Sequence, residues 1–111
     1  FIHLHYLSVL TNGIANIKVG AQNCHSARNG AFTGEVSAAM IKSTGASHVI
    51  LGHSERREFF DEDDALLAEK VNIALASGLH PIFCCGEKLE VRDAGTHEQL
   101  VRTQLENGLF I

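Results

Sequence analysis

Three short apolar runs, recurring about 30 residues apart, limit the folds open to this chain more than any other feature. They occupy residues 17–22, 48–52 and 81–85. Their spacing is close to that of one strand, crossover helix and next parallel strand. Each run is apolar almost throughout, which is typical of parallel strands covered on both faces. The sequence therefore predicts an α/β fold in which three parallel strands alternate with helices, in either a doubly wound sheet or part of a (β/α)8 barrel.

The segments around these strands have helical signals. Helices are predicted over residues 2–10, 37–43, 55–77 and 96–105. The third is interrupted near the acidic run 61–64, which favours a new helix start. We expect its buried stripe at Leu67, Val71, Ala74 and Leu75. The last predicted helix begins with the capping-box spacing of Thr96 and Gln99.

Composition restricts the classes of function. The 111 residues include 13 acidic and 9 basic side chains without long blocks of one sign, giving a formal charge of −4. This does not resemble the basic surface of a protein that binds nucleic acid or anionic membranes. No apolar stretch approaches the ~20 residues of a spanning helix. We expect neither a nucleic-acid nor a membrane partner.

The cysteines and the first residues indicate a cytoplasmic protein. The three cysteines are odd in number, and the residues after Phe1 do not read as a signal peptide. A zinc site made from Cys24, His25, Cys84 and Cys85 would lack the spacers typical of structural zinc. We expect Cys84 and Cys85 to be buried strand residues. The acidic run lacks EF-hand spacing, so no metal site is predicted.

A histidine stands where the second predicted strand gives way to a charged helix start. Backbone N–H dipoles at such a position disfavour the cationic form of His53. A neutral imidazole held there can donate a hydrogen bond to a developing oxyanion. The alternative interpretation, a satisfied structural histidine, is the more common one for a strand end.

Four motifs, each at a strand end or in the following loop, closely resemble the triosephosphate isomerase family. The resemblance extends over residues 15–107 and includes Val19-Gly20-Ala21-Gln22-Asn23, Gly30-Ala31-Phe32-Thr33-Gly34-Glu35, Gly52-His53-Ser54-Glu55-Arg56-Arg57 and Cys85-Gly86-Glu87-Lys88-Leu89. It implies that the strands are the third to fifth of a TIM barrel. It also implies interconversion of dihydroxyacetone phosphate and glyceraldehyde 3-phosphate through an enediolate, in glycolysis and gluconeogenesis, by a homodimer with no cofactor.

The resemblance assigns catalytic roles at the second strand. His53 matches the electrophile of the family, whose own chemistry uses a neutral histidine and a glutamate base. Glu55 matches a glutamate that supports the active-site network, with Ser54 beside it. Glu55 can alternatively be read as a helix-start carboxylate.

The resemblance also assigns dimer contacts. Phe32 and Thr33 match the tip of a loop that enters the partner subunit, and Glu35 and Arg56 match residues that pair across the dimer. Turn glycines around Phe32 and a solvated Arg56 are the alternatives.

Several parts of the family pattern are missing. A complete barrel needs about 250 residues, and the first-strand Asn-x-Lys, the lid loop with its base glutamate and the phosphate loops are absent. Lys18, Lys42 and Glu90 do not replace them. We therefore expect residues 1–111 to be one incomplete domain from the centre of the barrel, with no substrate-binding residues and no activity alone. A non-catalytic association module of the same barrel is the alternative, and another phosphosugar barrel enzyme is a more distant one.

Overall fold

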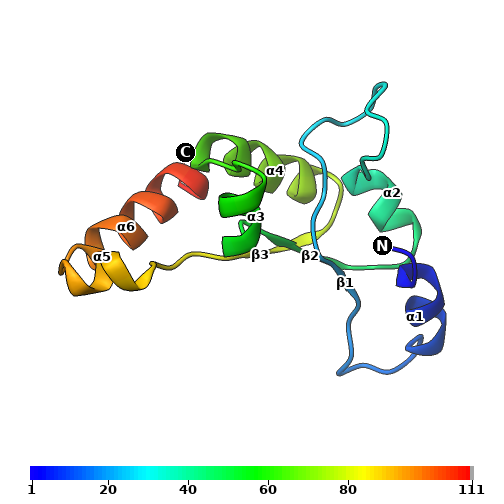
Figure 1. Cartoon of the computed structure of the whole chain (residues 1–111). Helices are drawn as coiled ribbons and strands as arrows, with labels where there is room; N and C mark the ends of the chain where they lie inside the picture. The colour runs from blue at the N-terminus through cyan, green and yellow to red at the C-terminus, as the bar shows by residue number, and fades with distance from the viewer. Residues whose placement is uncertain (111) are drawn as a thin grey trace.

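The computed structural model describes residues 1–110, and strands alternate with helices along the chain (Figure 1). The strands are β1 (Gly20–Ala21), β2 (His48–Leu51) and β3 (His80–Phe83). The helices are α1 (Leu4–Leu10), α2 (Ala38–Ser43), α3 (Ser54–Phe59), α4 (Asp64–Ala76), α5 (Leu89–Asp93) and α6 (His97–Gly108).

The three strands form one parallel sheet in the order β1-β2-β3. Gly20, His48 and His80 lie side by side in register at its amino end. This confirms the predicted parallel α/β arrangement. The strands are shorter than their apolar runs predicted, because β1 keeps only two residues and β3 ends at Phe83.

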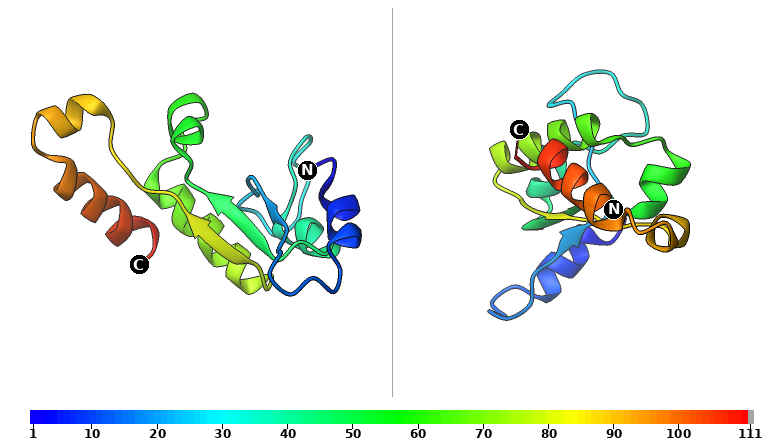
Figure 2. Two further views of the ribbon diagram at one scale, coloured as in Figure 1. Left: turned by 90° about the horizontal axis from the view of Figure 1, so that it is seen from below. Right: turned by 90° about the vertical axis from the view of Figure 1, so that its left-hand side faces the viewer.

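One face of the sheet is covered and the other is open. Val49 and Leu51 are fully buried in a core shared with Val71 and Ala74 of α4, and α4 lies along β2 and β3 (Figure 2). On the opposite face Ile82 is 50% exposed. The expected cover on both faces is therefore not supplied by residues 1–110.

Local capping chemistry places two helix starts as predicted. Ser37 accepts a hydrogen bond from the backbone N–H of Met40 at 3.1 Å, and Asp63 accepts one from Leu66 at 2.8 Å. Each satisfies a donor that the helix itself leaves unpaired. The interruption near residues 61–64 is confirmed as the break between α3 and α4.

Two helical predictions are wrong in detail, and one helix, α5, was not predicted. Leu75 is 56% exposed although Val71, one turn earlier on the same side of α4, is buried, because residues 1–110 leave this side of the last turn of α4 uncovered. Thr96 makes no capping hydrogen bond and has φ −104° and ψ 9°, whereas an N-cap normally has extended backbone. Its backbone N–H donates to the carbonyl oxygen of Val91, in the middle of the unpredicted helix α5, which draws Thr96 out of the capping conformation.

Candidate active site

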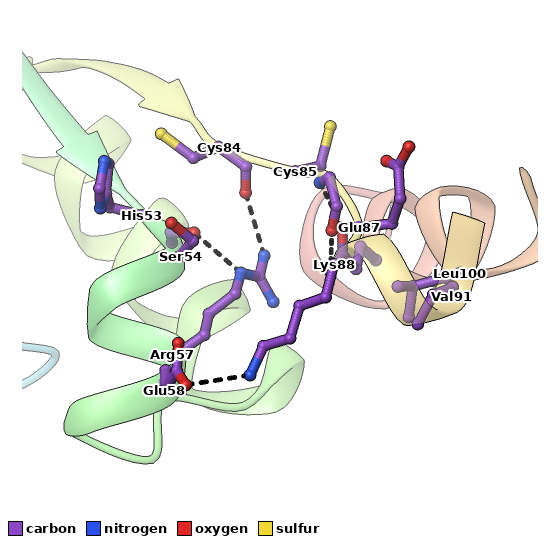
Figure 3. Close-up of a pocket in the computed structure, with 13 residues that line it drawn as sticks. His53, Ser54, Arg57, Glu58, Cys84, Cys85, Glu87, Lys88, Val91 and Leu100 are labelled. Atoms are coloured by element: carbon purple, nitrogen blue, oxygen red, sulfur yellow. Dashed lines mark hydrogen bonds and ion pairs between the residues drawn. The ribbon is translucent and has the colours of Figure 1, made fainter. Parts of the chain in front are cut away.

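The carboxyl ends of β2 and β3 meet at one edge of the sheet and border a pocket of about 540 Å³ (Figure 3). His53 and Ser54 line it from the β2 side, and Cys84, Cys85 and Lys88 line it from the loop after β3. In (β/α)8 barrels this edge bears the catalytic residues. The topology therefore brings His53 to the end of the sheet where barrel chemistry takes place.

His53 is the N-cap of α3, and its own side chain makes the cap. Nδ1 accepts a hydrogen bond from the backbone N–H of Glu55 at 3.3 Å. A ring nitrogen accepts only when it is unprotonated, so in the neutral ring the proton is on Nε2. The side chain is 49% exposed, which leaves the ring accessible from the pocket.

Glu55 and Ser54 lie in the first turn of α3. The Glu55 side chain is 73% exposed, and its Oε2 is 3.7 Å from Nδ1 of His53. The structure therefore places this predicted pair side by side at the sheet edge. Ser54 lines the pocket next to them.

The loop between β1 and α2 projects away from the sheet and holds the predicted dimer residues (Figure 1). Phe32 is 48% exposed and lies 4.4 Å from the His25 ring, measured between ring centroids. Glu35 is 3.8 Å from the same histidine, between Oε2 and Nδ1. Thr33 is exposed beside Phe32.

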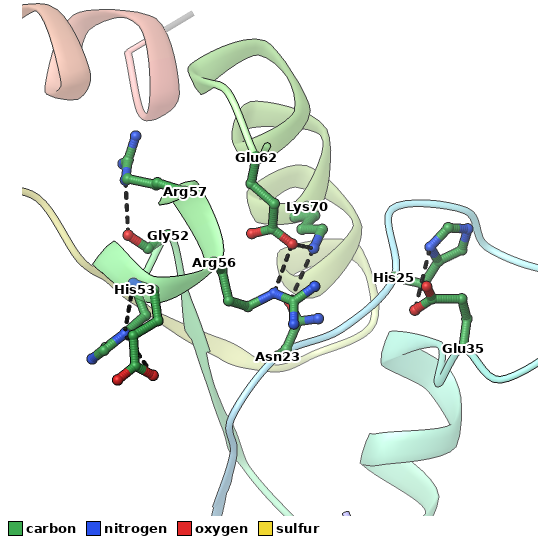
Figure 4. Close-up of polar contacts among 10 residues, drawn as sticks. Asn23, His25, Glu35, Gly52, His53, Arg56, Arg57, Glu62 and Lys70 are labelled. Atoms are coloured by element: carbon green, nitrogen blue, oxygen red, sulfur yellow. Dashed lines mark hydrogen bonds and ion pairs between the residues drawn. The ribbon is translucent and has the colours of Figure 1, made fainter. Parts of the chain in front are cut away.

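Arg56 belongs to a buried polar network beneath α3 (Figure 4). Its Nε donates to Oε1 of Glu62 at 2.8 Å, and Nζ of Lys70 donates to the same oxygen. Lys70 also donates to Oδ1 of Asn23 at 3.0 Å. Burial by itself would raise the pKa of Glu62, but the hydrogen bonds from Lys70 and Arg56 outweigh it and lower that pKa. Arg56 is therefore not the solvated charge of the alternative reading.

Sequence reasoning missed the roles of Lys70, Glu62 and Arg57. Lys70 did give a signal, because it lies three residues after Leu67 and four before Ala74 on the buried stripe of α4. A charged residue at such a position is rarely buried without a partner. Arg57 gave no comparable signal, although its guanidinium contacts β2, the loop after β3 and α4.

The expectation for two cysteines is wrong. β3 ends before them, Cys84 is only half-buried and Cys85 is exposed. Cys24 is fully buried, and burial raises the pKa of its thiol to about 11. Within residues 1–110, no three His, Cys, Asp or Glu side chains are grouped so as to hold a metal ion. In the same range no helix is long and apolar enough to cross a membrane.

A sequence model of the family described as triosephosphate isomerase matches residues 1–110. The chain belongs to the triosephosphate isomerase family. The triosephosphate isomerase of Porphyromonas gingivalis is 52% identical over 110 residues, which are 99% of this chain and 43% of that protein. The triosephosphate isomerase of Cytophaga hutchinsonii is 51% identical over the same shares.

A solved structure supports the same family and fixes the fold. The crystal structure of triosephosphate isomerase from Bartonella henselae superposes with a TM-score of 0.92 at 43% identity, covering 96% of this chain and 45% of that one. The three-stranded sheet is therefore an open part of a TIM barrel, as predicted. The chain spans less than half the length of these relatives.

Two lysines considered above lie away from His53. Lys42, at the end of α2, donates from Nζ to the carbonyl oxygen of Gly78 at 2.9 Å, near the amino end of β3. Lys18 precedes β1, also at the amino end of the sheet. Glu90 lies in α5. None of the three lines the pocket beside His53.

Proposed function

We propose that the protein to which this chain contributes interconverts dihydroxyacetone phosphate and D-glyceraldehyde 3-phosphate by proton transfer through an enediolate. The observation that supports this most directly is the His53 ring at the carboxyl end of β2, whose Nδ1 accepts a backbone hydrogen bond. Membership of the triosephosphate isomerase family supports the substrate class. The reaction belongs to glycolysis and gluconeogenesis.

His53 acts as the electrophile in this proposal. With the proton on Nε2, the ring donates a hydrogen bond to the substrate carbonyl oxygen. That hydrogen bond strengthens as the oxygen gains negative charge in the enediolate, so it stabilises the transition state more than the bound substrate. Glu55, beside the ring, supports the network of the site. The base that removes the substrate proton comes from outside the residues described here.

We also propose that the protein is a cytoplasmic homodimer that uses the projecting loop. The tip residues Phe32 and Thr33 enter the partner subunit, and Glu35 and Arg56 pair across the interface. The half-exposed Phe32 ring supports this assignment, because insertion into a partner would remove an apolar surface from water. The three free thiols fit a reducing compartment.

The test is His53→Gln in the full-length protein, with activity measured in a coupled isomerase assay. Loss of one oxyanion donor typically lowers kcat by about 10²–10³-fold, and KM should change far less because the interaction is made chiefly in the transition state. His3→Gln is the matched control, since His3 is an exposed histidine next to α1. A His53→Gln enzyme with kcat close to wild type would refute the electrophile role. A full-length protein without isomerase activity would favour the association module.

The protonation state of the His53 ring can be measured separately from activity. Nitrogen-15 NMR of the full-length protein should report one neutral tautomer of His53, protonated at Nε2. A ring that carries protons on both nitrogens at neutral pH would overturn the neutral electrophile even if the isomerase activity stood.

A further inference from the structure

The guanidinium of Arg57 joins three elements around the site. Its Nε donates to the carbonyl oxygen of Gly52 at 2.8 Å, and Nη2 donates to the carbonyl oxygen of Cys84 at 3.1 Å. Nη1 donates to Oδ1 of Asp64 at 2.7 Å. These partners lie at the end of β2, directly after β3 and in the first turn of α4. The Arg57 side chain is 18% exposed, so these contacts are well shielded from water.

Arg57 acts on the site through its hydrogen bond to the carbonyl oxygen of Gly52, the residue before His53. This carbonyl and the backbone N–H of His53 belong to one planar peptide. A hydrogen bond that fixes the carbonyl direction therefore also fixes the plane from which the His53 side chain leaves the backbone. Arg57 also lines the pocket, but its Nε, Nη1 and Nη2 all donate to protein acceptors (Figures 3 and 4).

The packing around Gly52 leaves little room for the turn to change. Gly52 has φ +76°, and a Cβ placed there would lie 3.0 Å from Nη2 of Arg57 and 3.1 Å from the Cys84 oxygen. The two strand ends and the guanidinium are thus in close contact at the residue before His53. A lysine cannot reproduce the arrangement, because its single ammonium lacks the planar fork that spans several acceptors.

We infer that Arg57 is a positioning residue for His53. It fixes the carboxyl end of β2 to that of β3 and to α4, and thereby sets the direction of the imidazole toward the substrate carbonyl. Arg57 itself does not touch the substrate. This inference rests on the proposed function, because it requires that His53 act on the reacting oxygen.

The experiment is a double-mutant cycle of Arg57→Lys and His53→Gln in the full-length protein. Misplacing a catalytic group by about 1 Å can reduce the rate by about 10²-fold, so Arg57→Lys should lower kcat by about 10- to 100-fold with KM changed by less than about 3-fold. In the His53→Gln background the same change should lower kcat by less than about 3-fold, since residues that act as a unit are not additive. Arg102→Lys is the matched control, because Arg102 is exposed and pairs with Glu106 on α6. Its kcat should equal that of wild type.

The possible outcomes separate this inference from the proposed function. Equal losses from Arg57→Lys in both backgrounds, or a kcat within about 2-fold of wild type, would overturn the positioning role while leaving His53 as the electrophile. If His53→Gln alone leaves kcat close to wild type, the proposed function fails instead. Should Arg57→Lys not fold, as judged by circular dichroism, Asp64→Asn replaces it in the cycle. That variant should lower kcat only when His53 is present, and an additive loss would again overturn the inference.

Discussion

Replacing Glu62 by glutamine tests the buried network that underlies α3. The side chains of Glu62 and Lys70 are 3% and 4% exposed, so neither charge is stabilised by water. Both Lys70 and Arg56 donate to the same oxygen of Glu62. Glutamine keeps an acceptor near that position but removes the negative charge, which leaves the buried Lys70 ammonium next to the Arg56 guanidinium without a carboxylate between them.

The expected loss of stability follows from this burial. Removing one partner of a buried ion pair typically costs about 3–5 kcal/mol. Asn23 still accepts from Lys70 at 3.0 Å, and glutamine can still accept, so we expect the lower end, about 3 kcal/mol. The double variant Glu62→Gln/Lys70→Met removes the ammonium that has lost its carboxylate and fills the space with apolar atoms. It should therefore be more stable than Glu62→Gln alone by at least about 1 kcal/mol.

The assay is urea denaturation of the full-length protein, followed by far-UV circular dichroism at one fixed protomer concentration. The pH gives an independent readout. Because the pKa of Glu62 is lowered from 4.5 in the folded protein, its stabilisation is present above that value and is lost as the pH falls through the folded pKa. Glu62→Gln should show a shallower loss of stability over this acid range. A loss below about 1 kcal/mol at neutral pH, or a double variant as unstable as the sum of both single variants, would refute the reasoning.

Three further predictions concern the dimer loop, the isolated chain and the core thiol. Phe32→Asp should shift the full-length protein toward monomer in sedimentation velocity, because a charge cannot replace the half-exposed ring in an apolar pocket. Thr33→Ser is the control and should stay dimeric. A Phe32→Asp variant that also stays dimeric on dilution would contradict the interface assignment. The 111-residue chain alone should have no isomerase activity in a coupled assay and weak near-UV circular dichroism, since the sheet has an open face with Ile82 half exposed and unpaired edges; sharp near-UV signals with turnover would disprove this. Cys24 should resist alkylation at about pH 8 in the native full-length protein and react once it is denatured, because burial raises the pKa of its thiol to about 11; mass spectrometry with a Cys24→Ser control identifies the site, and native labelling at the rate of a free thiol would be inconsistent with burial.

The sequence by itself determined those features that depend on neighbours along the chain. The spacing of three apolar runs predicted parallel strands separated by helices, and the structure contains β1, β2 and β3 in that order. The helix starts near residue 37 and in the acidic run 61–64 could be predicted, because their caps, Ser37 and Asp63, reach only three residues ahead. His53 could be placed at a strand end for the same reason. Its capping hydrogen bond to Glu55 spans two residues.

Only the tertiary structure decided the features that join distant segments. Thr96 had the spacing of a capping box, but its hydrogen bond to Val91 in the preceding helix removed it from the capping conformation. Lys70 is paired with Asn23 across 47 residues, and Arg57 reaches Cys84 across 27. A long charged side chain is compatible with both solvent and a buried partner, because its sequence neighbours do not fix where its end lies. Whether such a residue is a solvated charge or a structural contact is decided by which backbone carbonyls and carboxylates the fold brings within hydrogen-bonding distance of it.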